Sequence, residues 1–390
     1  MWMRLLDICD FQGGSQPPKE EWSFAEQEGY IRMLQIRDFT QSEKVTPEYI
    51  KISNCIKTCT EDDVLIARYG ASIGKVLTGI AGAYNVAIMR TIPDTDIIRK
   101  RFLYYYLKSS YFQYAILNVG SRAAQAGFNK TDLAKLEITC PELSKQDKIV
   151  KILEKVESII QKRKDQLNAL DYIIKARFVE MFGDAVANPK KWPVKKLKDI
   201  SVQINSGNTP KGGSENYVDE GIAFFRSQNV WKNRLEMEDI AYIDAKTHAN
   251  MKRSSLKHGD ILMTKTGRIN TENSSLGRAA LYLGEDDMAN VNGHVYFIRL
   301  KPGVSNMFVL RILVSPEYVD LIRGVCVGGI DKRQLNKEHI EDFPIICPPT
   351  DMVNEYVKFV CQVDKSKVVV QKALDEAQIL FDSLMQKYFG

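Results

Sequence analysis

The sequence predicts an α+β fold: two repeated α/β domains, each followed by one long helix, with the two helices paired as a coiled coil. Three observations support this: β-rich motifs that recur in the same order, two long segments without internal glycine or proline, and an apolar heptad seam along both segments. We therefore expect a first domain at 1–143, a long helix at 144–183, a second domain at 184–349 and a second long helix at 350–390.

Motifs of one half recur in the other in the same order. The matched pairs are glycine- and proline-containing turns at 13–17 and 206–210, β-rich runs at 63–70 and 260–267, helical runs at 102–107 and 308–313, and Cys-Pro ends at 140–141 and 347–348. So many matches in one order indicate an internal duplication.

The two long segments, 144–182 and 351–389, carry apolar residues at alternating steps of four and three. The first seam is Ile149, Leu153, Val156, Ile160, Leu167, Leu170 and Ile174, and the second is Tyr356, Val360, Val363, Val370, Leu374, Phe381 and Leu384. This is the coiled-coil period, although an isolated seam also fits a helix packed on its own domain. Equal length and phase favour pairing of the two helices. Arg163, Arg177 and Lys367 interrupt the seams, either fixing the register or lying solvated at an edge.

Composition excludes several classes of protein. With 44% hydrophobic and 26% charged residues over 390 positions, the chain is neither collagen-like nor disordered. No apolar run approaches the roughly 18 residues of a membrane span, and Met1–Gly14 lacks the layout of a signal peptide. We therefore expect a cytoplasmic protein without a membrane partner. Seven scattered cysteines without a CxxC pair predict thiols and no structural zinc.

Catalytic motifs are missing. The run 69–76 resembles a phosphate loop, but its first glycine is one place late and Val76 stands where a magnesium-binding Ser or Thr belongs. The run 347–350 lacks the amide and the aromatic residue of an adenine methyltransferase tetrad, and four dispersed histidines suggest no metal or triad. We expect no catalysis, no metal site and no cofactor in this chain.

The loops instead carry basic and amide side chains, the types that bind phosphates and purine edges. A net charge of +5 permits a nucleic acid as partner. The candidate DNA-contacting residues of the first half are Arg32, Arg37, Arg68, Tyr69, Lys75, Arg122, Gln125, Asn129 and Lys130. Those of the second half are Arg226, Gln228, Asn229, Lys265, Thr266, Arg268, Asn270, Lys332, Arg333 and Gln334.

The layout resembles the specificity (S) subunit of type I restriction-modification systems. The motifs that carry the resemblance are the Phe-Val-Glu-Met-Phe-Gly-Asp run at 178–184, the Asn-Pro-Lys-Lys-Trp-Pro run at 188–193, the Gly-Asn-Thr-Pro turn at 207–210 and Gly-Asp-Ile-Leu at 259–262. The resemblance covers the whole chain. It implies that the two domains are target-recognition domains and that the long helices pair antiparallel.

The resemblance also implies a function. Each domain would read one half of a split, asymmetric target in double-stranded DNA, and the helices would set the unread spacer. Two methyltransferase (M) subunits would supply S-adenosylmethionine chemistry, and restriction (R) motor-nuclease subunits would add magnesium and ATP. Two other readings of the residues stay open: a coiled-coil interaction scaffold, which the basic loops disfavour, and a nuclease whose site is unrecognised.

Overall fold

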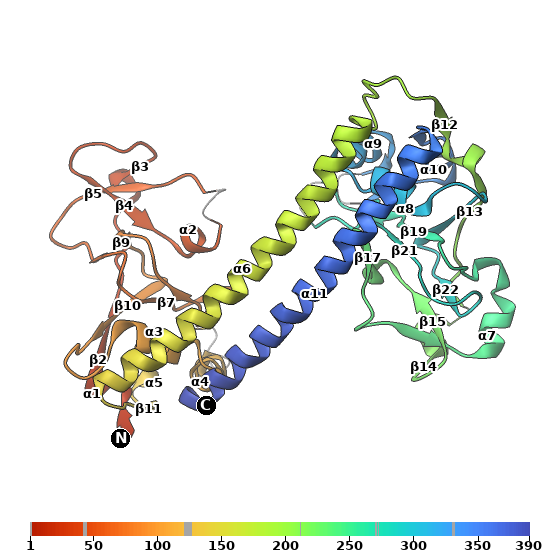
Figure 1. Cartoon of the computed structure of the whole chain (residues 1–390). Coiled ribbons are helices and arrows are strands. Elements are labelled where there is room, and N and C mark those ends of the chain that lie inside the picture. Colours follow the sequence, from red (N-terminus) through yellow and green to blue (C-terminus); the bar gives the residue numbers. More distant parts are fainter. Residues whose placement is uncertain are drawn as a thin grey trace. The chain divides into compact units, whose positions relative to one another are not determined.

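A computed structural model describes residues 2–41, 45–120, 127–210, 212–269, 271, 273–329 and 332–390. The chain forms two compact units (Figure 1). The first unit comprises Met1–Leu167 and Val369–Gly390, and the second comprises Asn168–Val368. Each unit therefore contains one α/β domain and a part of each long helix.

The domain of the first unit combines short strands with short helices. Its strands are β1 (Trp2–Arg4), β2 (Cys9–Gly13), β3 (Trp22–Ser23), β4 (Tyr30–Leu34), β5 (Tyr49–Lys51), β6 (Thr58–Cys59), β7 (Leu65–Ala67), β8 (Val76–Leu77), β9 (Gly82–Tyr84), β10 (Ile88–Pro93) and β11 (Glu137–Thr139). Its helices are α1 (Leu5–Ile8), α2 (Ile36–Thr40), α3 (Lys100–Lys108), α4 (Ser110–Gly120) and α5 (Lys130–Leu133), followed by the long α6 (Leu143–Phe182).

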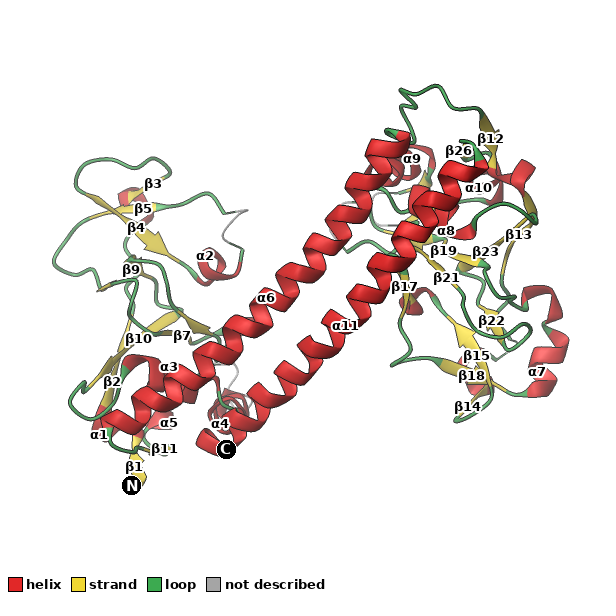
Figure 2. Cartoon of the chain, viewed as in Figure 1, coloured by secondary structure: helices red, strands yellow, loops and turns green. Residues whose placement is uncertain are grey.

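Two sheets organise this domain, shown by secondary structure in Figure 2. The helix-side sheet has the order β2-β10-β7-β8, and the outer sheet has the order β3-β5-β4-β9-β6. Strand β7 shows why both faces of the helix-side sheet are apolar, because successive side chains of a strand point to opposite faces. Ile66 packs in the core that contains Phe102 of α3, whereas Leu65 and Ala67 pack in the core that contains Leu34 of β4.

The domain of the second unit repeats this plan. Its strands are β12 (Val194–Lys196), β13 (Ser201–Ser206), β14 (Tyr217–Val218), β15 (Ile222–Phe225), β16 (Val230–Trp231), β17 (Arg234–Leu235), β18 (Ala241–Ile243), β19 (Ile261–Thr264), β20 (Thr266–Gly267), β21 (Ala279–Leu281), β22 (Ala289–Val291), β23 (Val295–Leu300), β24 (Val327–Gly328), β25 (Arg333–Gln334) and β26 (Pro344–Ile346). Its helices are α7 (Ala245–Asn250), α8 (Asn306–Leu313), α9 (Pro316–Val325) and α10 (Lys337–Glu341), followed by the long α11 (Thr350–Phe389).

Strand order confirms the duplication that the sequence predicts. The second helix-side sheet is β13-β23-β19-β21, in which each strand takes the place of its counterpart in the first, and the second outer sheet is β14-β18-β15-β22. Both outer sheets contain one parallel pair, β4 with β9 and β15 with β22. In the second unit the alternation recurs, since Ile261 and Met263 face the core of α8 while Leu262 faces the opposite core.

One glycine in each repeat is fixed by a close approach between the two sheets. A Cβ atom on Gly14 would lie 2.3 Å from the carbonyl oxygen of Tyr84, and one on Gly207 would lie 1.8 Å from that of Val291. No larger residue fits there without moving backbone. The matched turns therefore hold the end of β2 or β13 against the outer sheet.

The long helices begin and end close to their predicted bounds, and they pair antiparallel. In the second unit, Arg177 of α6 meets Glu355 of α11, whereas Asp171 meets Lys367 further along. The predicted seam faces inward: Ile149, Leu153, Val156, Ile160, Ile174, Tyr356, Val360, Val363, Val370 and Phe381 are buried, while Leu167, Leu170, Leu374 and Leu384 are half-buried.

The polar seam residues lie at the edge of this interface. Arg163 donates to Gln166 of its own helix at 2.9 Å. Arg177 and Lys367 form ion pairs with the facing helix, at 2.6 Å in both cases, and Arg177 also pairs with Glu180 of its own helix at 2.8 Å. The choice between register control and simple solvation therefore concerns only these two.

Candidate nucleic-acid interface

In the first unit, an arginine and a glutamine of the outer sheet share one carboxylate. Gln35 and Arg37 stand at the start of α2, and both donate to Oε2 of Glu48, which follows Arg37 by eleven residues. The distance from Arg37 Nη2 to Glu48 Oε2 is 2.5 Å. The side chain of Arg37 is 46% exposed and that of Glu48 is 17% exposed, so the guanidinium is the part that solvent reaches.

A buried acid fixes the chain around this group. Gln35 caps α2, and its backbone N–H donates to Asp38 Oδ2 at 2.9 Å. The other oxygen of Asp38 accepts Nη2 of Arg32 at 2.8 Å. Because Asp38 is 2% exposed, its two bonds hold both Arg32 and the first turn of α2 in place.

In the second unit, the equivalent loop carries the same group with two residues exchanged. Arg226 Nη2 and Gln228 Nε2 lie 3.1 Å and 2.9 Å from Oδ2 of Asp239, which follows Gln228 by eleven residues. The hydrogen bond from Gln228 and the charge of Arg226 lower the pKa of Asp239. The carboxylate is therefore ionised at neutral pH.

Asn229 is the counterpart of Asp38, and it is the predicted DNA contact that the structure buries. Its Oδ1 accepts the backbone N–H of Arg226 at 2.9 Å, and its Nδ2 donates to the carbonyls of Glu236 and Asp239, both at 3.1 Å. Asn229 is 1% exposed. Its amide is used to fix the loop, so we drop it from the set of proposed DNA contacts.

A second group of predicted residues gathers beside the helix-side sheet of the first unit. Arg68 Nε donates to the carbonyl of Phe128 at 2.8 Å, and Tyr69 pairs with Gly127 as an isolated bridge. Lys130 forms an ion pair with Asp10, and Asn129 caps α5. These contacts bring Arg68, Tyr69, Asn129 and Lys130 to one place.

The second unit builds the matching group from two short strands. Thr266 of β20 pairs with Gln334 of β25, and the backbone N–H of Leu335 donates to the carbonyl of Lys265 at 2.9 Å. Arg333 lies in the same strand as Gln334 and donates through Nη1 to the carbonyl of Cys326 at 3.3 Å. Arg268 and Lys332 are exposed beside these strands.

The remaining predicted residues stand apart. Lys75 is exposed in the turn before β8. Arg122, Gln125 and Asn270 lie outside the described residues. In each unit the predicted residues therefore form two groups. The outer group lies at the start of α2 in the first unit and at residues 226–229 in the second. The helix-side group lies around the loop that follows β7 or β19.

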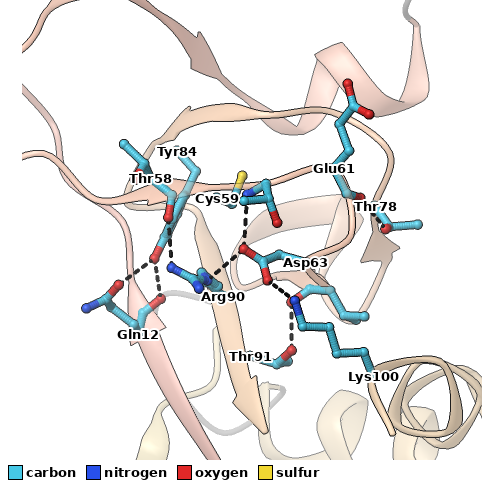
Figure 3. Close-up of polar contacts among 12 residues, drawn as sticks. Gln12, Thr58, Cys59, Glu61, Asp63, Thr78, Tyr84, Arg90, Thr91 and Lys100 are labelled. Carbon is cyan, nitrogen blue, oxygen red and sulfur yellow. Dashed lines mark hydrogen bonds and ion pairs between the residues drawn. The ribbon is translucent and has the colours of Figure 1, made fainter. Parts of the chain in front are cut away.

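A buried ion pair ties the two sheets of the first unit together (Figure 3). Asp63 is 2% exposed and lies 2.7 Å from Lys100 Nζ and 3.1 Å from Arg90 Nε. Arg90, in β10 of the helix-side sheet, also donates to the carbonyl of Thr58 in β6 of the outer sheet at 3.0 Å. Burial raises the pKa of Asp63, but the hydrogen bonds from Lys100 and Thr60 and the two nearby cations outweigh it and lower the pKa overall.

The second unit repeats this pair at the equivalent strands. Arg299 of β23 binds Asp260 through Nε at 2.9 Å and Nη2 at 2.6 Å, and Nη2 also reaches the carbonyl of Ser255 at 3.1 Å. Ser255 bridges to Asn290 of the outer sheet. In both units, therefore, one arginine fixes the outer sheet to the helix-side sheet and so positions the two loop groups.

The part of the chain that the structure describes offers no group of three or more His, Cys, Asp or Glu side chains arranged to hold a metal ion. Its helices are also too short or too polar to span a membrane.

Sequence reasoning missed three members of the outer groups: Gln35, Glu48 and Asp239. The signal was present, because an arginine and a glutamine two positions apart are followed in both halves by an acid at the same distance. The glutamine comes first in the first half and the arginine comes first in the second, so a comparison of identical residues does not find the match.

Comparisons with known proteins agree with this architecture. Residues 1–169 match the family described as the type I restriction modification DNA specificity domain. The MjaVIII specificity subunit of a type I restriction enzyme from Methanocaldococcus jannaschii is 23% identical over 67% of this chain, and the match spans only 62% of that relative. The MjaIX specificity subunit of the same organism is 23% identical over 98% of this chain and 91% of the relative.

Solved structures show the same fold. The S subunit of a type I restriction-modification system from M. genitalium superposes with a TM-score of 0.56 at 15% identity, covering 100% of this chain and 96% of that one. The fold, the matched domain and the relatives agree with one another and with the duplicated plan of the sequence. By its matched first domain, its relatives and its fold, the chain is similar to the specificity subunits of type I restriction-modification systems.

Proposed function

We propose that this chain is the DNA sequence-recognition subunit of a type I restriction-modification complex and performs no catalysis itself. The observation that carries the proposal is the duplication: each unit presents arginine, lysine and amide side chains on the same two kinds of loop. These are the groups that bind phosphates and read base edges. Two sets of them suit a target in two parts.

The two half-sites are unequal under this proposal. The first unit offers Arg37 where the second offers Gln228, and the stretch from Arg268 to Ser275 is longer than its counterpart from Ala71 to Ile73. Arginine and glutamine favour different bases, guanine and adenine respectively. A palindromic target would not suit such loops.

The proposal assigns chemistry to partner subunits and places the complex in the cytoplasm. Two M subunits would bind S-adenosylmethionine and methylate the target, and R subunits, where present, would add ATP- and magnesium-dependent cleavage. The long antiparallel helices would set the number of base pairs between the half-sites. Their matched length of 40 residues each supports this role.

The decisive experiment is co-expression with the M subunits, followed by purification and mapping of methylated adenines across the host genome. We expect one bipartite, asymmetric motif with a fixed spacer, and no methyl transfer by the isolated chain. A palindromic motif, or methylation by the chain alone, would overturn the proposal.

Insertions in the helices test the spacer. Four residues added after Gln166 of α6 and four after Val368 of α11 lengthen both helices by about 6 Å and rotate the seam by about 40° beyond one full turn. At about 3.4 Å per base pair, this predicts one or two extra base pairs of spacer with both half-sequences unchanged. A two-residue insertion, which rotates the seam by about 200°, is the control and should impair assembly. An active four-residue variant with the original spacer would contradict the idea.

A further inference from the structure

Resting on the DNA-reading function proposed above, we propose that one residue in each domain reads a purine and that a fixed carboxylate aims it. Arg37 reads a guanine in the first half-site, aimed by Glu48, and Gln228 reads an adenine in the second, aimed by Asp239. Gln35 and Arg226 brace these two groups.

The two groups share their connectivity even though their residues differ. Each contains one arginine and one glutamine, both donating to a single carboxylate oxygen: Oε2 of Glu48 or Oδ2 of Asp239. The carboxylate follows the second of the two by eleven residues in both units. An accidental surface contact would not be expected to recur with these elements in two domains of different sequence.

Exposure separates the reading residue from the bracing residue. Gln35 caps α2, and Arg226 caps a short 3₁₀ helix at Ser227–Asn229. Both are half-buried, whereas Arg37 and Gln228, two positions later, are exposed. Arg226 is held further, because it also donates to the backbone carbonyl of Asp239 and lies 5.7 Å from the ring centroid of Tyr217. The exposed position is thus an arginine in the first unit and a glutamine in the second.

The carboxylate favours base edges over phosphates as the ligand. It neutralises part of the charge of the arginine and repels a phosphate, whereas the acceptor atoms of a base edge carry no net charge. Arg37 uses Nη2 for Glu48 and keeps its other donors for the O6 and N7 atoms of guanine. Gln228 turns its Nε2 toward Asp239, which fixes the amide so that Oε1 and the second N–H hydrogen can meet the N6 and N7 of adenine.

The test exchanges the readers in the intact complex with the M subunits. Methylome mapping should show that Arg37→Gln changes one position of the first half-site from guanine toward adenine, and that Gln228→Arg makes the converse change in the second. Competition binding with oligonucleotides that carry each base at that position should show a preference altered roughly tenfold, the size of one bidentate contact. In each variant the other half-site should stay unchanged.

The carboxylates are positioning residues and need a readout of their own. Glu48→Gln and Asp239→Asn keep hydrogen-bonding atoms but remove a negative charge beside each reading residue, so the repulsion of phosphates is lost. Binding to unrelated DNA should strengthen and depend more steeply on salt, while discrimination in the affected half-site falls. A carboxylate with only a structural role would leave the salt dependence unchanged.

A matched control removes an arginine–carboxylate pair elsewhere. Arg99→Gln breaks an exposed pair with Asp147, 3.1 Å apart, in the first unit and should change neither motif nor salt dependence. An unchanged motif in both exchange variants, or a change in the half-site of the other domain, would overturn the proposal. Should the exchange variants fail to assemble, the carboxylate variants decide the proposal: an unchanged salt dependence together with unchanged discrimination in the affected half-site would overturn it. The absence of any bipartite motif in the unaltered complex would instead contradict the proposed function itself.

Discussion

In the second unit, Phe182 at the end of α6 packs edge-on against Phe308 of α8, with 5.0 Å between ring centroids. In the first, Phe389 at the end of α11 packs against Phe102 of α3 at 4.9 Å. The rings are equivalent, since each ends a long helix and meets the same helix of the domain. Their surroundings are not.

The difference lies in the neighbours. Phe178 and Tyr356 complete an aromatic cluster around Phe182, with centroids 5.2 and 5.5 Å away. At the equivalent heptad positions the first unit has Met385 and Ile149, which are also buried. The duplicated fold therefore keeps the contact that joins helix to domain while the side chains that fill the space around it vary, as core packing permits when total volume suits. The loops show the same pattern, because the positions of their polar groups recur in both units while the residues at those positions differ.

Truncating these rings is expected to give the largest effect and to distinguish the two units. Phe182→Ala removes a ring that is fully buried between three others and should lower the free energy of unfolding by about 4 kcal/mol. Phe389→Ala should cost less, because the ring is 9% exposed and the end of a helix can relax. Denaturant unfolding measures both. Val179→Ala, on the exposed face of α6, is the control. Equal losses for the two phenylalanines would contradict the comparison.

Removing the buried aspartates should have the next largest effect. Asp260→Ala leaves Arg299, which is 21% exposed, without its carboxylate and should cost about 3 kcal/mol. Asp63→Ala should cost less, because Arg90 and Lys100 are 29% and 37% exposed and regain water more easily. Chemical unfolding of both variants ranks them. Asp147→Ala, which removes an exposed partner of Arg99, should change little. A larger loss for Asp63→Ala would show that exposure of the cations does not govern the cost.

A smaller effect is expected when the pH is lowered: the unaltered chain should lose stability more steeply than the Asp63→Asn variant. The pKa of Asp63 is lowered in the folded chain, so its ion pairs stabilise the fold above the unfolded pKa of about 3.9. That contribution is lost as the pH falls through the lower, folded pKa. Asp63→Asn cannot lose it, so the stability of this variant should fall less steeply below about pH 4. Thermal melts from pH 7 to pH 3 measure the slopes. Parallel slopes would show that Asp63 contributes nothing to the acid sensitivity.

The sequence predicts the frame of this molecule better than its surface. The 3.5-residue seam and the repeated motifs depend on periodicity and order, which a single sequence displays, and α6 begins only one residue before its predicted start. Whether a polar side chain on a loop is exposed depends instead on the hydrogen bonds that it makes. Asn229 and Gln228 are adjacent polar amides, yet one is 1% exposed in its own loop and the other is exposed. Asp38 and Asn229 show that caps and DNA contacts draw on the same residue types, so composition alone cannot separate them.

The smallest expected effect concerns the ion pair of Lys367 across the helices of the second unit. The ammonium group lies 2.6 Å from Asp171, whose side chain is 59% exposed, so the pair is well hydrated. Lys367→Ala should cost about 0.5 kcal/mol, the usual range for such pairs.

Lys367→Met keeps the apolar stem against the seam and should cost nothing measurable if the lysine is merely solvated there. If the lysine instead fixes the register, Lys367→Met should preserve stability but allow helices to pair between chains, because a polar seam residue excludes alternative pairings at some cost in stability. Denaturant unfolding measures the first quantity and light scattering the second, with Asp171→Ala as the matched control for the ion pair. A loss well above 1 kcal/mol on Asp171→Ala would contradict both interpretations, since neither assigns that energy to the carboxylate.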